Sequence, residues 1–355
     1  SATSTQTASH TKTATMTHTP YVSLTATSTR TSTSTRTSTM TRTNTLTRTI
    51  TLTRTSSRTA TRTATRTAST RLTPVLPVIP RIHFLFKRYL RDVYIYGQRR
   101  GNDQHTFAKI GDSITASPYF LNDIGCGGEN MAAYTSLADT VTFFRQQRFT
   151  PSLGSGWCNT SNSFNANSPS AVPGWNAYYP ILTSYLMPGY ISICKKPYNT
   201  PISCEVGLKR PSIAFIMYGS NDVTNGQIDN FITSLGYLID YCLEQGVIPV
   251  VSTIPPRLDN PLYQSRVPSY NDAIAQLADA KRVPLWNYWA ALQSPEMIHY
   301  GMSDDGIHPN VYRNTQSADF SREGLRYGYN QRNLTAIQML DTLRRIVILN
   351  GPPDP

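Results

Sequence analysis

Hydroxyl side chains alternate strictly with residues of varied type over the first seventy residues. Every odd position from Ser1 to Ser69 is Ser or Thr, with Tyr21 as the one exception. A period of two matches an extended strand, whose successive side chains point to opposite faces, whereas a helix would spread the threonines around its circumference and crowd their branched side chains. The pattern therefore predicts an extended rod or a disordered stalk over residues 1–71, outside any globular core.

The even positions of this segment carry its charge. Lys12 is followed by arginines, at first six residues apart and then closer: Arg30, Arg36, Arg42, Arg48, Arg54, Arg58, Arg62 and Arg66. No acidic residue precedes Asp92 and no glycine precedes Gly97, so counter-charges and hairpin turn residues are missing. We expect a long extended strand that does not fold back, spanning roughly 230 Å at full extension.

Such a strand needs a partner to become ordered. Its apolar area is too small to offset a backbone entropy cost of roughly 1–2 kcal/mol per residue. In-register stacking would place Arg above Arg at about 4.8 Å, so glycan-clad extension of mucin type suits the composition better. The expected O-linked sites are Thr31, Thr33, Thr35, Thr37, Thr39, Thr41, Thr43, Thr45, Thr47, Thr49, Thr51 and Thr53. We interpret residues 1–71 as a self-associating filament or stalk segment, with a flexible, cell-wall-binding linker as the alternative.

A globular domain is expected after a Pro-rich linker. Residues 72–81 contain Pro74, Pro77 and Pro80, which favour a stiff extended chain. From Ile82 the pattern becomes helical, and residues 82–350 are long enough for one α/β domain with a large loop insertion.

Short apolar runs and helical stripes alternate along this domain. The predicted strands are 106–110, 213–218, 247–254 and 283–286, and the main predicted helices are 228–242, 270–280 and 333–349. The alternation predicts a parallel sheet covered on both faces, with polar residues at strand ends as site candidates.

Charge separates the two parts of the chain. Of the formal net charge of +12, Lys12 and the nine arginines up to Arg71 supply +10, which leaves 23 basic and 21 acidic residues after them. A nearly neutral domain and a tail with a single aromatic residue argue against nucleic-acid binding. Acidic polysaccharide is a better partner for the cationic segment, although the arginines could simply keep it soluble.

Cysteine usage indicates an oxidising compartment. Four cysteines lie in Gly-, Ser-, Asn- and Pro-rich loop sequence: Cys126, Cys158, Cys194 and Cys204. The preferred pairing is Cys194 with Cys204, closing a short loop, and Cys126 with Cys158; other pairings stay open, and Cys242 on a helical stripe is expected to be a buried thiol. The sequence begins at Ser1 without an initiator Met and has no run of eighteen apolar residues, so we expect a secreted or cell-surface protein without a membrane span.

Three polar clusters lie at predicted strand ends or in a late loop: Gly111-Asp112-Ser113, Gly219-Ser220-Asn221-Asp222 and Asp305-Gly306-Ile307-His308. Taken singly, each could be a turn, a helix cap or polar surface. In this order they resemble the SGNH (GDSL-type) hydrolase family in its first, third and fifth sequence blocks. The resemblance covers about residues 82–350 and implies a three-layer, flavodoxin-like parallel sheet with serine ester hydrolase activity and no cofactor.

The chemistry of these residues agrees with the resemblance. A serine needs a base to become a nucleophile, and that histidine needs an acceptor on its other nitrogen. Ser113, His308 and Asp305 can fill these roles. The resemblance further implies an oxyanion hole from the Ser113 amide, the Asn221 side chain and a glycine amide, with Gly174 preferred over Gly154 and Gly156; a structural turn is the alternative for all three.

Other residues carry weaker signals. The aromatic residues of the insertion could form a wall beside Ser113 or pack under a disulfide-tied loop: Trp157, Trp175, Tyr178 and Tyr179. Trp286 and Trp289 follow a strand and are expected in the core, and the histidines lack metal-ligand spacing. The sequence thus favours an extracellular filament or stalk subunit that carries an esterase domain for acyl or acetyl esters. The alternative is a purely structural glycosylated fibre protein with a catalytically silent domain.

Overall fold

The computed structural model describes residues 76–150, 152–154, 157–183, 194 and 197–355, together with the backbone of four short strands nearer the N-terminus. Ser1–Thr70 and Arg71–Pro355 form separate compact units.

The four N-terminal strands pair in twos. Strand β1 (Thr3–Ala8) is antiparallel to β4 (Ser32–Thr37), and β2 (Thr17–His18) is antiparallel to β3 (Val22–Ser23). The expectation that this segment does not fold back is therefore wrong for these strands. The physical reason is that antiparallel pairing satisfies backbone amide and carbonyl groups whatever the side chains are, so the lack of glycine and acidic residues does not prevent it. Of the expected glycan sites, Thr33, Thr35 and Thr37 lie in β4, and the others lie outside the described residues.

A parallel sheet organises the second unit. Its strands are β5 (Asp103–Gly111), β6 (Pro211–Met217), β7 (Ile248–Ser252) and β8 (Leu285–Trp286), hydrogen-bonded in this order. Ala171 makes a parallel bridge to Gly111 on the outer side of β5. With this bridge as a rudimentary second strand, the order becomes that of a flavodoxin-like fold, as expected.

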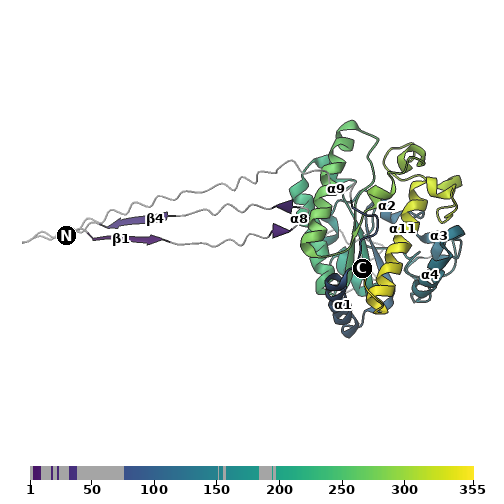
Figure 1. Cartoon of the computed structure of the whole chain (residues 1–355), viewed down its shortest axis with the longest axis horizontal. Helices are drawn as coiled ribbons and strands as arrows, with labels where there is room; N and C mark the ends of the chain where they lie inside the picture. The colour runs from purple at the N-terminus through teal and green to yellow at the C-terminus, as the bar shows by residue number, and fades with distance from the viewer. Residues whose placement is uncertain are drawn as a thin grey trace, which may run out of the picture. The chain divides into compact units, whose positions relative to one another are not determined.

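Helices cover both faces of the sheet. They are α1 (Phe84–Arg99), α2 (Ser113–Ala116), α3 (Asn122–Gly125), α4 (Ala138–Arg145), α6 (Pro201–Lys209), α7 (Asp222–Asn225), α8 (Ile228–Glu244), α9 (Pro261–Lys281), α10 (Tyr288–Ala291) and α11 (Gly328–Leu343), which ends in a π-helical turn (Arg344–Ile348). Short 3-10 turns lie at Ala132–Leu137, Tyr179–Ile181, Ile298–Gly301, Tyr312–Asn314 and Gly324–Arg326. Figure 1 shows α8 and α9 on one side of the sheet and α11 and α4 on the other.

Two helices begin earlier than the apolar pattern predicts. Helix α9 starts at Pro261, because the Asn260 side chain accepts a hydrogen bond from the Leu262 amide at 2.8 Å and caps it, and the helix continues through Pro268. Helix α11 starts at Gly328, where the amide donates to Asn310 Oδ1 at 2.7 Å. The Asn260 cap is local and the Asn310 contact comes from a distant part of the chain, and helical periodicity contains neither signal.

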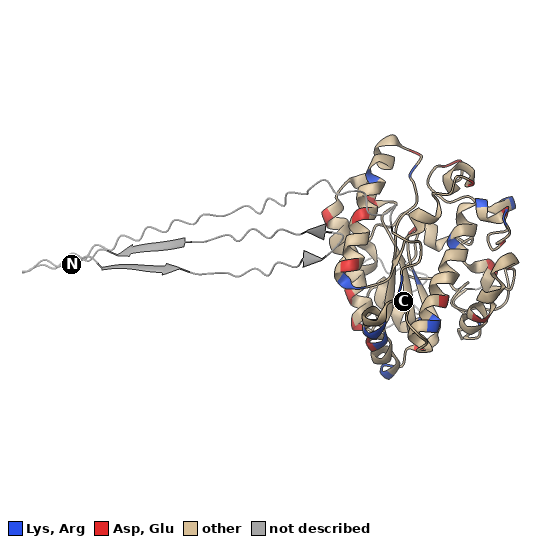
Figure 2. Cartoon of the chain, viewed as in Figure 1, with Lys and Arg blue, Asp and Glu red and all other residues tan. Residues whose placement is uncertain are grey.

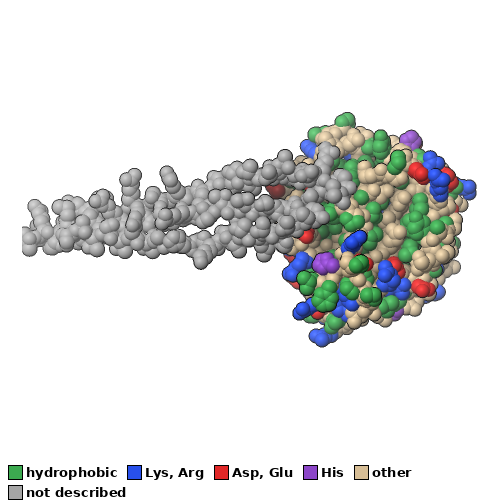
Figure 3. All heavy atoms as spheres, viewed as in Figure 1, with side chains coloured by type: hydrophobic (Ala, Val, Ile, Leu, Met, Phe, Trp, Pro, Cys, Tyr) green, Lys and Arg blue, Asp and Glu red, His purple; other side chains and the backbone are tan. Residues whose placement is uncertain are grey.

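Aromatic side chains fill the core on the α11 face of the sheet. Phe107 meets Phe144, Phe164 and Phe215 edge to face, with ring centroids 5.0–5.7 Å apart. Trp286 is fully buried as expected, whereas Trp289 is only partly buried against the core. Figure 2 shows acidic and basic residues interspersed over this unit, and Figure 3 shows apolar side chains scattered among polar ones on the visible face.

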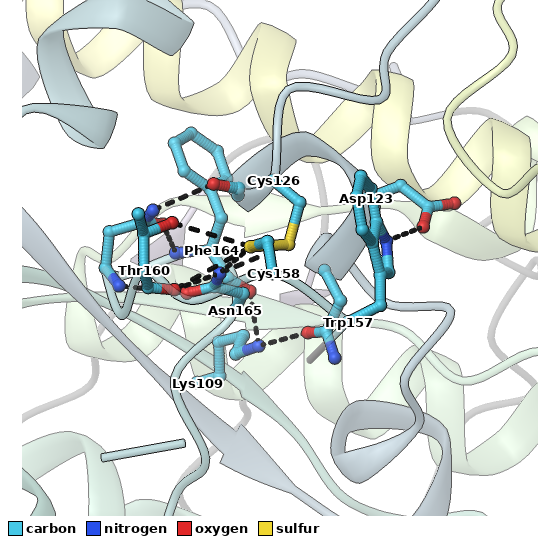
Figure 4. The surroundings of a disulfide bond; sticks show 11 residues. Lys109, Asp123, Cys126, Trp157, Cys158, Thr160, Phe164 and Asn165 are labelled. Atoms are coloured by element: carbon cyan, nitrogen blue, oxygen red, sulfur yellow. Dashed lines mark hydrogen bonds between the residues drawn. A yellow bond between two sulfur atoms is a disulfide. The ribbon is translucent and has the colours of Figure 1, made fainter. Parts of the chain in front are cut away.

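The long insertion covers the outer edge of β5. The amide of Phe107 donates to Ser163 Oγ at 3.0 Å, and the Gly111 amide donates to the Ser170 carbonyl at 2.9 Å. The insertion is stapled by the disulfide between Cys126 and Cys158, shown in Figure 4. These contacts satisfy the edge amides that an open sheet would expose.

Both disulfides join the pairs preferred from the sequence. Cys194 is bonded to Cys204, and Cys242 is a buried free thiol on α8, as expected. Burial raises the pKa of the Cys242 thiol to about 12, so it stays protonated and unreactive.

The described part of the Pro-rich segment packs on the domain. Asn287 donates from its amide to the Val78 carbonyl and from its side chain to the Leu76 carbonyl, both at 2.9 Å. Ile82 and Asp354 also hydrogen-bond to each other through two contacts. The C-terminal residues beyond 350 thus belong to the same packed structure. Within the described residues, no helix combines the length and the apolarity needed to cross a bilayer.

A buried charge cluster lies beside β5. Lys209 Nζ lies 2.8 Å from Glu205 Oε1 with neither side chain exposed, and the Lys109 amide donates to the same oxygen at 3.3 Å. Lys109 Nζ donates to the Phe164 carbonyl at 2.6 Å (Figure 4). Burial and the Lys209 charge lower the pKa of Lys109 to about 7, against the opposing effect of Glu205. Glu205 therefore supplies the counter-charge for the buried ammonium group of Lys209.

We expect Glu205→Gln to lower the free energy of unfolding by about 3–5 kcal/mol, because Lys209 would stay buried without a counter-charge. Urea-induced unfolding measures the loss. Glu296→Gln is the matched control: Glu296 pairs with Arg322 at 3.2 Å, with the two side chains 53% and 83% exposed, and its loss should cost less than about 1 kcal/mol. Equal effects of the two variants would contradict the role assigned to Glu205.

Candidate active site

The three polar clusters meet at the carboxyl end of the sheet. Ser113 begins α2 directly after β5, and Asn221 follows β6. Between these neighbouring strands the chain reverses its winding direction, since Ala171 pairs on one side of β5 and β6 on the other. Such switch points open a crevice at the sheet edge, which is where ligands of open α/β sheets bind.

A hydrogen-bonded chain joins the late loop to the strand end. His308 Nε2 lies 2.8 Å from Ser113 Oγ, and His308 Nδ1 lies 2.6 Å from Asp305 Oδ2. The His308 and Asp305 side chains are 37% and 46% exposed, so the chain is open to solvent on one side. The sequence placed these three residues in one site, and the structure brings them within hydrogen-bonding distance.

Asp305 receives hydrogen bonds on both oxygens. Its Oδ1 accepts from the amides of Ile307 and His308 at 2.8 and 2.9 Å and from Ser303 Oγ at 2.8 Å. Partial burial raises its pKa, but the hydrogen bonds from His308, Ile307 and Ser303 outweigh this and hold the pKa of Asp305 well below its usual range. Asp305 is thus an ionised acceptor that fixes a proton on His308 Nδ1 and leaves Nε2 facing Ser113.

The turn that carries Ser113 is held from both ends. Asp112 Oδ1 accepts from the Ile114 amide at 3.0 Å and caps α2. From α11, Arg332 donates to the Ile114 carbonyl at 2.6 Å, and the Tyr329 hydroxyl donates to it at 3.2 Å. The Ser113 amide donates no hydrogen bond to the described residues. These contacts fix the turn and leave that amide free to bind another acceptor.

Burial changes the protonation of Asp112. Its side chain is fully buried, and desolvation raises its pKa to about 6 despite the Ile114 amide, the Arg332 and His308 charges and the Ser220 hydroxyl, which all lower it. Asp112 Oδ2 and Ser220 Oγ are both buried without a hydrogen-bond partner among the described residues.

The oxyanion-hole candidates lie on adjoining loops. Asn221 Nδ2 donates to the Trp175 carbonyl at 3.0 Å, which leaves its second amide hydrogen for another acceptor. Gly174 occupies the turn closed by the Trp175 amide and the Val172 carbonyl, and its φ of 80° after Pro173 is that of a type II turn. The turn expected as an alternative for Gly174 is therefore present, and it lies beside Asn221.

Of the two competing glycines, the structure describes Gly154. Gly154 has a φ of 95°, and a Cβ there would lie 2.4 Å from Asn167 Nδ2. Backbone conformation and tight packing within the insertion therefore account for a glycine at this position. Gly156 lies outside the described residues.

Arg257 connects the two loops of the site, and the sequence analysis did not identify it. Its guanidinium donates to the Ser220 carbonyl and to both oxygens of Asp259, at 2.7 and 2.9 Å for the latter. The adjacent Leu258 amide donates to the Gly306 carbonyl at 2.7 Å. The peptides next to Asn221 and Asp305 are therefore tied to one segment. An Arg-x-Asp sequence directly after a predicted strand is the signal that could have revealed it.

A cleft of about 650 Å³ opens beside Ser113 and His308. Its aromatic lining comes from Tyr119, Tyr327 and Tyr329, and Ser117 and Asp304 also face it. The insertion aromatics expected as a possible wall do not line this cleft. The four aromatic residues of the insertion lie outside the lining of this cleft.

Two of those aromatic residues illustrate the difference. Trp175 is 7% exposed and packs in the core, in line with the packing alternative. Trp157 is 67% exposed, and its Nε1 donates to Asp123 Oδ1 at 3.1 Å (Figure 4). Among the residues that the structure describes, no group of His, Cys, Asp and Glu side chains has the arrangement of a metal site.

Comparison with curated proteins gives no significant match. Among solved structures, the chain is similar to a GDSL-like lipase from Bacteroides thetaiotaomicron, with 13% identity, a TM-score of 0.39 and coverage of 71% of this chain and 98% of that one. It is also similar to the esterase EstA from Pseudoalteromonas sp., with 14% identity, a TM-score of 0.39 and coverage of 67% and 100%. A third similar structure is the acetylxylan esterase Axe2 from Geobacillus stearothermophilus, with 14% identity, a TM-score of 0.37 and coverage of 66% and 93%.

The profile of the GDSL-like Lipase/Acylhydrolase family matches residues 110–312. The match spans more than half of the 355 residues and contains Ser113, Asn221, Asp305 and His308. The chain belongs to the GDSL-like Lipase/Acylhydrolase family.

Proposed function

We propose that residues 82–350 are a serine ester hydrolase that acts on acyl or acetyl esters, carried by an extracellular stalk or filament segment at residues 1–71. The observation that carries the enzymatic part is the hydrogen-bonded chain from Ser113 through His308 to Asp305, with distances of 2.8 and 2.6 Å. Membership of an acylhydrolase family supports the reaction class.

The first half-reaction transfers the acyl group to the enzyme. Ser113 Oγ attacks the ester carbonyl carbon while His308 Nε2 takes its proton, and the carbonyl π-electrons move to oxygen. His308 then gives that proton to the leaving alcohol oxygen as the C–O bond breaks. Asp305 does not take up the proton; its negative charge stabilises the protonated imidazole and keeps it oriented.

The second half-reaction releases the acid. Water loses a proton to His308 Nε2 and attacks the acyl carbon, and the proton returns to Ser113 Oγ when the acyl bond breaks. Negative charge develops on the carbonyl oxygen in both steps. The Ser113 amide, the second hydrogen of the Asn221 amide and the Gly174 amide are the donors assigned to it, and neither backbone amide has an acceptor among the described residues.

The assignment to an extracellular stalk rests on different features. The Ser/Thr row of residues 1–71 suits O-linked glycans, and its arginines suit acidic polysaccharide. Two disulfides in the domain are compatible with secretion. The strict period-two pattern also favours the alternative, a structural glycosylated fibre protein with a silent domain, because that pattern has no use in catalysis.

We expect Ser113→Ala to lower kcat for p-nitrophenyl acetate by about 10⁴-fold or more and to abolish covalent labelling by a fluorophosphonate, because the nucleophile is lost. Ser117→Ala is the matched control, since Ser117 lines the same cleft, and should keep both properties. Undiminished hydrolysis by Ser113→Ala would refute the catalytic assignment, and an inactive wild-type protein would favour the structural alternative.

Asp305→Asn should lower kcat by about 10³–10⁴-fold, because an amide can present a hydrogen to His308 Nδ1 and favour the wrong tautomer. The pKa of Asp305 lies well below its usual range, so the carboxylate is ionised throughout pH 5–9 and its own titration should add no limb to the wild-type rate–pH profile in that window. Rate–pH profiles test this. The neighbouring Asp304→Asn, which also faces the cleft, should stay within about threefold of the wild type.

Removal of residues 1–71 should give a soluble domain that retains esterase activity, because the fold and the site are built within the second unit. The full-length protein from its natural source should carry heterogeneous hexose mass on the threonine row and sediment as large assemblies. Intact-mass and sedimentation measurements that show an unmodified, monomeric full-length chain would rule out the stalk assignment.

A further inference from the structure

A second cleft, of about 470 Å³, lies between the insertion and the start of α8. Amide and hydroxyl side chains dominate its lining: Asn176, Asn225, Gln227, Asn230, Thr233 and Ser234. Asn230 Nδ2 donates to Gln227 Oε1 at 2.8 Å, so part of this polar surface is already oriented. No Lys, Arg or His belongs to the described residues that line the cleft.

Aromatic surface completes the lining. Tyr178 is 39% exposed, and its ring packs against Tyr179 with centroids 4.2 Å apart, which supports the exposed ring from behind. Phe231 is 2% exposed and forms part of the floor. A supported, partly exposed ring next to hydrogen-bonding side chains offers apolar contact and polar contact to one ligand.

Asp222 provides the one acidic group of this lining. It is 6% exposed, and its Oδ1 accepts from the Ala177 amide at 3.2 Å. No hydrogen bond within the described residues reaches its Oδ2. Burial raises the pKa of Asp222 to about 7, against the effect of the Ala177 amide. A buried carboxyl oxygen without a donor is costly, and Asp222 thereby places an unsatisfied acceptor within the wall of the cleft.

The cleft adjoins the candidate oxyanion hole. Asn221 and Trp175 are joined by the 3.0 Å hydrogen bond from Asn221 Nδ2 to the Trp175 carbonyl. The next residue along each chain segment, Asp222 and Asn176, lines the cleft. The wall of the cleft is therefore continuous in sequence with the two residues that this hydrogen bond joins.

These features select one chemical class of ligand. An acyl chain would leave the amides and hydroxyls without hydrogen bonds, and an anionic group would meet Asp222 without a cation to bind it. A neutral sugar presents many hydroxyls and one apolar ring face, which match this lining. We propose that this cleft, formed around Tyr178, Asp222 and Asn230, is a subsite for a neutral saccharide, which makes the ester hydrolysed at Ser113 an ester of a neutral glycan. The second part rests on the proposed function.

The experiment compares two substrates and measures binding separately. Thr233→Trp fills the cleft from an exposed position on α8, Tyr178→Ala removes the ring, and Asn230→Ala removes an amide. Tyr237→Ala is the control, because Tyr237 is an exposed tyrosine on α8, 60% accessible, that does not line the cleft. Each variant is assayed with p-nitrophenyl acetate and with acetylated xylopentaose. Calorimetry measures binding of unesterified xylopentaose, cellopentaose and mannopentaose to the full-length protein.

Three cleft variants that each lower kcat/KM for acetylated xylopentaose by about tenfold, with p-nitrophenyl acetate changed less than twofold, would support the subsite. Equal activity of all variants on both substrates would overturn it. An inactive wild-type protein would remove the proposed function, and calorimetry then decides alone: binding of a neutral pentasaccharide that Thr233→Trp abolishes supports the cleft, and absence of binding overturns it.

Discussion

The tight junction of β5 and α2 is the constraint on which the site depends. At Gly111 a Cβ would lie 2.3 Å from Thr115 Oγ1 and 2.5 Å from the Met217 carbonyl, so only glycine fits between the turn and the neighbouring strand. The Gly111 backbone bonds to Ser170 and Val172 on its other side. One residue thus joins three segments at the point where Ser113 leaves the sheet.

Buried charges hold this junction together from outside the sheet. Arg332 is 1% exposed and stacks 3.7 Å above the Phe120 ring while it donates to the Ile114 carbonyl and to Thr115 Oγ1. Burial lowers the pKa of Arg332, while the Tyr329, Tyr288 and Asp112 side chains counteract this. Moving a guanidinium out of water costs free energy, and the interactions that it gains in the interior often do not exceed that cost. Its hydrogen bonds instead fix the orientation of the turn, and Arg257 does the same for the loops that carry Asn221 and Asp305.

The sequence predicted what local patterns encode. Alternating apolar runs gave the parallel sheet, and the clusters around Ser113, Asn221 and His308 marked where its strands end. The roles of three residues were not predicted, because each residue contacts a segment far away in the chain and has no periodic signature: Arg257, Arg332 and the capping partner Asn310. The aromatic residues of the insertion were ambiguous for the same reason: whether a Trp is exposed, like Trp157, or buried, like Trp175, depends on partners that spacing does not identify.

The two clefts differ in their apolar lining. The cleft beside His308 combines Tyr119, Tyr327 and Tyr329 with aliphatic residues and with polar residues such as Ser117 and Asp304, whereas the cleft around Asp222 is lined mainly by amides and hydroxyls. An ester has two halves of unlike chemistry, and hydrolysis requires both to be held while its carbonyl oxygen meets the candidate donors between them. Under the proposed function, a site flanked in this way distinguishes esters by their alcohol as well as by their acid. Specificity of this kind depends on the relative position of the loops, which is the property that Gly111, Arg257 and Arg332 control.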